Sequence, residues 1–95
     1  MTTDIIGEYR FDLGQIFVTP GVEELIDKGL LLDLYIDRHW RGDWGNLDDE
    51  NKQTNEDAVL HGDRILSSYQ SPVGKFWIIT EADRSTTTAI TPDEY

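Results

Sequence analysis

The sequence contains no cysteine. Disulfide bonds, thiolate metal ligands and a cysteine nucleophile are therefore excluded, and we expect a chain suited to the reducing cytoplasm. Long apolar runs are also missing, and none of those present is long enough to cross a membrane. The first residues show no basic segment followed by an apolar one, so we expect no signal peptide.

Basic residues are scarce as well. Eight Lys and Arg residues stand against 19 Asp and Glu residues, which gives a formal net charge of -11 and a pI of about 4.3. Nucleic acids and anionic lipid headgroups attract basic surfaces, so this composition argues against direct binding to either. A basic protein, such as one with a DNA-binding groove, is the partner that the charge favours. We expect the chain itself to be a monomer or a weak dimer.

The acidic residues are concentrated in the middle of the chain. Between Gly42 and Asp63 there is a single basic residue, Lys52. The acidic residues of this segment are Asp43, Asp48, Asp49, Glu50, Glu56, Asp57 and Asp63. Such a local and uncompensated excess opposes compact folding through self-repulsion, so it calls for an explanation.

Hydrophobic residues make up 38% of the chain and aromatic residues 11%. This content supports a modest core and argues against a disordered chain. We expect one domain over residues 1–95, with residues 1–7 loosely held. No repeat and no interdomain linker is evident.

The first half of the chain predicts one strand and three helices. Residues 11–18 alternate as in a strand. A helix follows from Pro20, capped by Thr19 and ended by Gly29, and a second helix is predicted over residues 31–41. The third helix is expected over residues 48–61, with few apolar residues on any face.

The second half predicts three strands, over residues 64–69, 75–80 and 86–91. The connections between them are short, so we expect an antiparallel meander. The first strand is expected to join the same small antiparallel sheet, with two or three helices packed on one face. The predicted fold class is α+β.

The predicted third helix brings acidic residues together. Residues seven apart return to the same side of a helix, which pairs Asp49 with Glu56 and Glu50 with Asp57. These four carboxylates form one predicted stripe, and Asp43, Asp48 and Asp63 extend it. The stripe is a candidate surface for a basic partner, and its alternative is a solvated helix face that serves solubility.

Trp44 lies in the turn before this helix and has two interpretations. An exposed Trp44 would be an anchor residue of a protein interface. Alternatively, its ring folds back over the helices as a lid.

Signals for catalysis and for metal binding are weak. The run Asp48–Glu50 and the i,i+4 pair Asp57 and His61 offer possible metal ligands, but no calcium-loop or His-Glu-x-x-His motif is present. A Ser67, His61 and Asp63 trio has no nucleophile-elbow context. His39 is predicted to be structural. We therefore expect no enzyme and no cofactor, with a metal-dependent hydrolase as the alternative.

Four segments carry a resemblance to a known group of proteins. They are residues 42–45 (GDWG), 61–69 (HGDRILSSY), 77–85 (WIITEADRS) and 91–95 (TPDEY). With them the chain resembles, from about Phe11 onward, a family of small bacterial proteins that occur with plasmids, phages and other mobile elements. The resemblance implies a setting in which mobile DNA meets bacterial defences, and it transfers no catalytic residue.

Charge and resemblance together predict an acidic inhibitor of a CRISPR effector or restriction system, acting as a DNA mimic. The predicted partner-binding residues are Asp43, Trp44, Asp48, Asp49, Glu50, Glu56, Asp57 and Asp63. The alternative is a non-catalytic accessory or regulatory module that binds another host protein.

Overall fold

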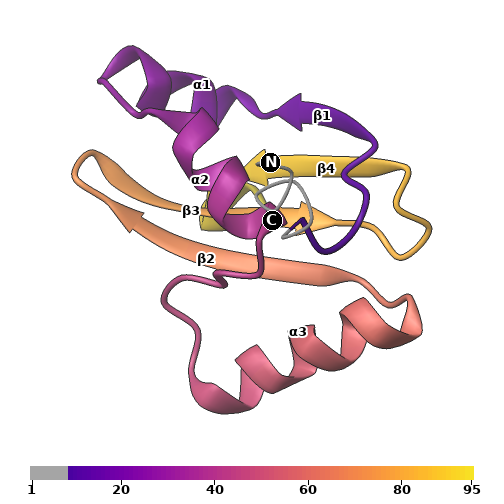
Figure 1. Ribbon diagram of the computed structural model, residues 1–95. Helices are drawn as coiled ribbons and strands as arrows, with labels where there is room; N and C mark the ends of the chain where they lie inside the picture. Colours follow the sequence, from indigo (N-terminus) through magenta and orange to yellow (C-terminus); the bar gives the residue numbers. More distant parts are fainter. Residues whose placement is uncertain (1–8) are drawn as a thin grey trace, which may run out of the picture.

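The computed structural model describes residues 9–95, so the expectation that residues 1–7 are loose lies outside it. The elements, in chain order, are β1 (Gln15–Val18), α1 (Pro20–Asp27), α2 (Leu32–Trp40), α3 (Asp49–His61), β2 (Ile65–Ser71), β3 (Gly74–Thr80), β4 (Thr86–Ile90) and a 3-10 turn η2 (Pro92–Glu94). This arrangement confirms the predicted α+β class, with three helices between the first strand and a C-terminal meander (Figure 1). Over the described residues, no helix is long and apolar enough to span a bilayer.

The four strands form one sheet in the order β1-β4-β3-β2. The pairs β2–β3 and β3–β4 are antiparallel, as the meander requires. β1 joins β4 in parallel, so the sheet is mixed rather than antiparallel as predicted. Three helices and the strands β2 and β3 separate β1 from β4 in the chain, and a long connection of this kind permits parallel pairing.

One side of the sheet carries the main core. Helices α1 and α2 cover this side in Figure 1. The buried apolar side chains that meet there are Val22, Leu25, Leu30, Leu32, Tyr69, Phe76, Ile78 and Ala89. We call this side the helix-covered face and the opposite side the open face.

β1 begins at Gln15 and not at Phe11 as predicted. Gly14 has a φ of +66°, and a Cβ atom at this position would lie 2.2 Å from the Ser85 carbonyl oxygen. A residue with a left-handed backbone and no room for a side chain must be glycine, and it turns the chain away from the strand conformation. Residues 11–14 alternate like a strand, but the turn at Gly14 delays the start of β1 to Gln15.

Helix α3 lies along the outer edge of β2 (Figure 1). The Asn55 side chain donates to the Leu66 carbonyl (2.8 Å) and accepts from the Leu66 N–H (3.2 Å). Further along, Ser68 forms a parallel bridge with Gly45, and the Asn46 side chain accepts from the Gln70 N–H. Residues 45–46 and Asn55 of α3 therefore cover the outer edge of β2, and the Asn55 hydrogen bonds fix α3 against this strand.

The C-terminal turn is attached to the start of α1 through Glu94. Its carboxylate accepts hydrogen bonds from the Thr19 and Thr91 hydroxyls (2.6 and 2.7 Å) and from the Gly21 N–H (2.8 Å). These bonds, first that from Thr19, lower the pKa of Glu94 to about 2. The Glu94 carboxylate therefore connects η2 to the N-terminus of α1.

We expect Glu94→Gln to destabilise the fold at neutral pH and to have no effect at low pH. The folded-state pKa lies below the unfolded one, so the contribution is complete above about pH 4.5 and is lost as the pH falls towards about 2. Melting temperatures of wild type and variant should differ at about pH 7 and converge near about pH 2. Asp93→Asn, a neighbouring exposed change, should show no such difference. A difference that is equal at both pH values would contradict this role of the ionised carboxylate.

Candidate functional site

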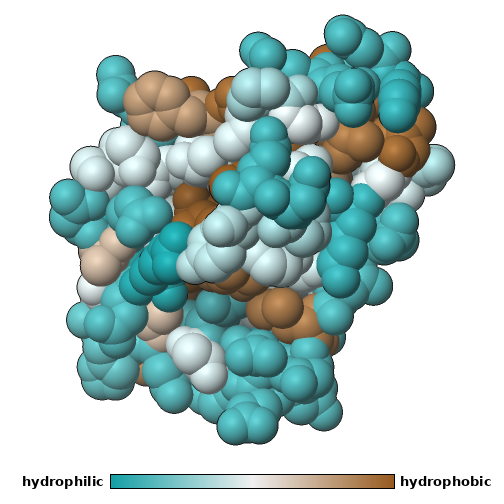
Figure 2. All heavy atoms as spheres, turned by 180° about the vertical axis from the view of Figure 1, so that it is seen from behind, coloured by the Kyte–Doolittle hydropathy of each residue, from teal (hydrophilic) through white to brown (hydrophobic). Residues whose placement is uncertain are grey.

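The exposed side of α3 carries the candidate surface. Asp48 caps the helix, with its carboxylate accepting from the Asn51 N–H at 2.8 Å. Asp49, Glu50 and Asp57 follow and are exposed. Glu50 and Asp57 are two turns apart and face the same way, about 10.5 Å apart along the axis. Figure 2 shows hydrophilic side chains over the lower end of the molecule, where α3 lies in Figure 1.

Two of the predicted residues are paired with arginines. The Arg38 guanidinium contacts Asp43 at 2.7 Å and lowers the pKa of that carboxyl. Arg10 binds Glu56 through two hydrogen bonds of 2.8 and 2.9 Å. The hydrogen bonds from Arg10 lower the pKa of Glu56 most, and the hydrogen bond from the Trp44 indole N–H lowers it further. Both carboxylates stay ionised, but their charge is largely compensated locally.

Trp44 is buried, with 3% of its surface exposed. It packs with Ala58 and Ile65 in a second small core, and its Nε1–H donates to Glu56 at 2.9 Å. The lid interpretation is therefore the correct one, and Trp44 is no exposed anchor. Glu56 is partly exposed, but its carboxylate is held by Arg10 and Trp44, so it is not one of the free charges that the predicted stripe requires.

Five of the predicted acidic residues are both exposed and free of an arginine partner within the described chain. They make no ion pair among the residues that the structure describes, and they are Asp48, Asp49, Glu50, Asp57 and Asp63. We call them the acidic face. Asp49, Glu50 and Asp57 lie on α3, Asp48 caps its N-terminus and Asp63 follows its C-cap, so α3 and its two ends present all five charges.

A buried network around His39 was not predicted. Its Nδ1 lies 2.6 Å from Ser67 Oγ and its Nε2 lies 2.9 Å from Thr80 Oγ1. Thr80 in turn contacts Thr87 Oγ1 at 2.7 Å, and Thr87 donates to the Leu13 carbonyl at 2.7 Å. The network therefore joins α2 to β2, β3, β4 and the segment before β1.

The network fixes the protons of its members. A hydroxyl carries one hydrogen, and Thr87 uses its own on the Leu13 carbonyl. Thr80 must therefore donate to Thr87, which leaves the His39 Nε2–H to donate to Thr80 and Nδ1 to accept from Ser67. Burial lowers the pKa of His39 to about 3, so the ring is neutral.

This Ser–His contact is structural. His39 and Ser67 are completely buried, so no substrate reaches them. The trio of Ser67, His61 and Asp63 is not assembled, because His61 is exposed at the end of α3 while Ser67 is buried against His39. One signal in the sequence was available: His39 follows Leu32 by seven residues and therefore lies on the buried side of α2.

Metal ligands do not converge within residues 9–95, where no group of three or more His, Asp or Glu side chains is arranged to hold an ion. Asp57 accepts a hydrogen bond from Gln53 at 3.1 Å. The described part of the chain therefore offers no assembled set of metal ligands.

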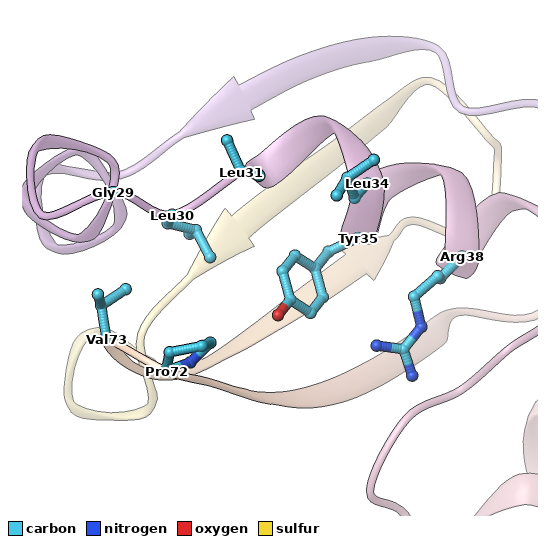
Figure 3. A pocket seen from close by; sticks show the side chains of 8 residues that line it. All are labelled: Gly29, Leu30, Leu31, Leu34, Tyr35, Arg38, Pro72 and Val73. Atoms are coloured by element: carbon cyan, nitrogen blue, oxygen red, sulfur yellow. The ribbon is translucent and has the colours of Figure 1, made fainter.

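A hollow of about 300 Å³ opens between α2 and the β2–β3 turn (Figure 3). Its lining is mostly apolar and comprises Gly29, Leu30, Leu31, Leu34, Tyr35, Arg38, Pro72 and Val73. Leu31 and Leu34 are 66% and 60% exposed. This volume is at the lower end of those found for ligand sites. The charge pattern of the sequence did not predict this hollow.

Searches against protein-family models, curated proteins and solved structures find no match to this chain.

Proposed function

We propose that this protein is a non-catalytic inhibitor that places the acidic face of α3 in the basic DNA-binding groove of a DNA-targeting complex. The observation that carries the proposal is the acidic face itself. Its five carboxylates are exposed, and none of them forms an ion pair with another described residue. An acidic surface repels DNA, so inhibition proceeds through the protein partner and not through the nucleic acid.

The mechanism is competition by charge. A DNA strand presents one phosphate per about 3.4 Å of axis, which is denser than carboxylates two helical turns apart. The acidic face therefore offers a coarse imitation of one strand to lysines and arginines. Complementary charge speeds association and makes it sensitive to salt. Anchoring of α3 by Asn55 and Ala58 supports this role, because a rigid surface loses little entropy on binding.

We propose the target class from the resemblance of the sequence to proteins of mobile elements. Mobile DNA is attacked by CRISPR effectors and restriction enzymes, both of which hold DNA in basic grooves. The duplex-engaging subunit of a type I CRISPR surveillance complex is the specific target we propose. The chain needs no cofactor for this role.

The proposal is tested with a purified type I surveillance complex and a labelled DNA duplex carrying its target. We expect the chain to prevent duplex binding in proportion to its concentration, and a pull-down from a host lysate to recover a nucleoprotein effector. Recovery of a protein without DNA-binding activity, together with unchanged duplex binding, would reject the proposal.

The hollow beside α2 supports a second candidate function. If the protein is an accessory or regulatory module, its partner would place an apolar side chain in this hollow, because interfaces are organised around such buried anchors. Leu31 and Leu34, exposed on its rim, favour this alternative.

The two functions are separated by the variant Leu31→Ser/Leu34→Ser. If the acidic face carries the function, this variant should inhibit duplex binding like wild type, because it leaves every charge in place. Both positions are exposed, so the fold should lose little stability. Loss of partner binding at an unchanged melting temperature would instead support the accessory module.

A further inference from the structure

The outer edge of β1 differs from that of β2. Gln15 and Thr19 direct their N–H groups to Ser85 and Ala89, on the β4 side. Because strand residues alternate, Ile16 and Val18 direct their N–H and C=O groups away from the sheet. Within residues 9–95 no strand pairs with that side.

The side chains of β1 are also uncovered. Ile16 is 47% exposed on the helix-covered face and Phe17 is 49% exposed on the open face. Natural proteins protect sheet edges with charges, prolines, bulges or covering segments. β2 is protected by Asn55, Gly45 and Asn46, but Gln15–Val18 has neither a charge nor a proline.

We propose that β1 is the contact surface for a second copy of this chain, paired antiparallel across a two-fold axis. With the axis at Phe17, Ile16 lies opposite Val18 of the other copy, and both present free N–H and C=O groups. Four backbone hydrogen bonds then form. Phe17 lies opposite its own copy in a non-hydrogen-bonded pair, where side chains approach most closely. The product is one continuous sheet of two identical halves.

The lack of charge along this edge permits a second copy to approach it. The sequence from Leu13 to Val22 contains no charged residue, so two copies approach here without like charges in contact. The acidic faces lie beyond β2, at the opposite edge (Figure 1). Seven strand spacings of about 4.8 Å separate the two β2 strands, or about 34 Å, far beyond a Debye length of about 8 Å.

The dimer goes beyond the proposed function and does not depend on it. It would place one acidic face at each end of the joined sheet, giving the inhibitor two binding surfaces. Salt separates the two proposals: added salt weakens binding to a basic groove, but it strengthens the association of two copies that each carry a charge of -11.

The test uses the absence of cysteine from the chain. In the proposed register the two copies of residue 17 have Cα atoms about 4.5 Å apart, within the range for a disulfide. Mild oxidation of Phe17→Cys should convert most of the protein to a covalent dimer. Ile16→Cys should react about tenfold more slowly, since its two copies lie more than about 7 Å apart. Leu60→Cys, exposed on α3, is the control for random collision.

Sedimentation of the unmodified chain completes the test. We expect twice the monomer mass of 10.9 kDa at millimolar concentration in about 1 M NaCl, where the Debye length is about 3 Å. Phe17→Lys should return the mass to that of the monomer, although it makes the net charge less negative. Monomer mass throughout, or equal oxidation of the three cysteine variants, would overturn the proposal. A dimer that is lost in Leu31→Ser/Leu34→Ser and kept in Phe17→Lys would also overturn it.

Discussion

Replacing His39 with alanine is expected to destabilise the fold by about 4 kcal/mol or more. The imidazole is fully buried and joins α2 to β2 through Ser67 and to β3 through Thr80. Its removal leaves a cavity and two buried hydroxyl groups that have lost a partner, at about 1–3 kcal/mol for each group. For a domain of this size the melting temperature should fall by about 20 °C or more.

The chain offers a matched control in its other histidine. His61 is exposed at the end of α3, and His61→Ala should change stability by less than about 0.5 kcal/mol. Chemical unfolding of the three proteins, followed by tryptophan fluorescence, measures both changes. Equal and small effects of the two substitutions would contradict the structural role of the His39 network.

The second large effect is expected from reversing charge on the acidic face. Glu50→Lys/Asp57→Lys should weaken inhibition of duplex binding by between about tenfold and a hundredfold, which corresponds to about 1.4–2.8 kcal/mol. Both residues are exposed and make no ion pair within the described chain, so the change acts mainly on the partner. Glu50 lies in the first turn of α3, where a lysine costs about 0.3–1 kcal/mol against the helix dipole.

The matched control is Glu24→Lys/Asp27→Lys. These exposed residues of α1 give the same change in net charge, so the two variants differ only in where the charge lies. The α1 variant should inhibit nearly as well as wild type. Inhibition constants are measured from duplex displacement, with melting temperatures as the check on folding. Equal weakening by both variants would mean that net charge alone, and not the acidic face, drives the interaction.

Reversal at Glu56, which the i,i+7 pattern suggests, cannot separate binding from folding. A lysine at this position would face Arg10 and leave the Trp44 indole N–H without its acceptor. The seven-residue spacing within one helix predicted that Glu56 lies beside Asp49 on the same side. What decides its role is an arginine 46 positions earlier in the chain, and local periodicity carries no information about such a contact.

Local signals predicted most of the fold. Thr19 and Asp48 were expected as helix caps, and both accept the expected backbone hydrogen bonds. The meander followed from its short connections. The direction of β1 was predicted wrongly, because three helices and two strands separate it from β4 and nothing local specifies how a distant strand pairs.

The candidate site was predictable in part. The sequence alone located the excess of acidic residues, and the structure leaves five of them, on α3 and its flanks, both exposed and unpaired within the described chain. It did not reveal the arginine partners of Asp43 and Glu56, nor the hollow beside Leu34. Both depend on which segments meet in three dimensions.

The central claim is that the acidic face occupies the same groove as DNA. It is tested most directly by titrating the chain into the surveillance complex at several concentrations of duplex. We predict that the concentration needed for half-inhibition rises in proportion to the duplex concentration once the duplex exceeds its own dissociation constant. A half-inhibitory concentration that stays constant as the duplex is increased would contradict the account.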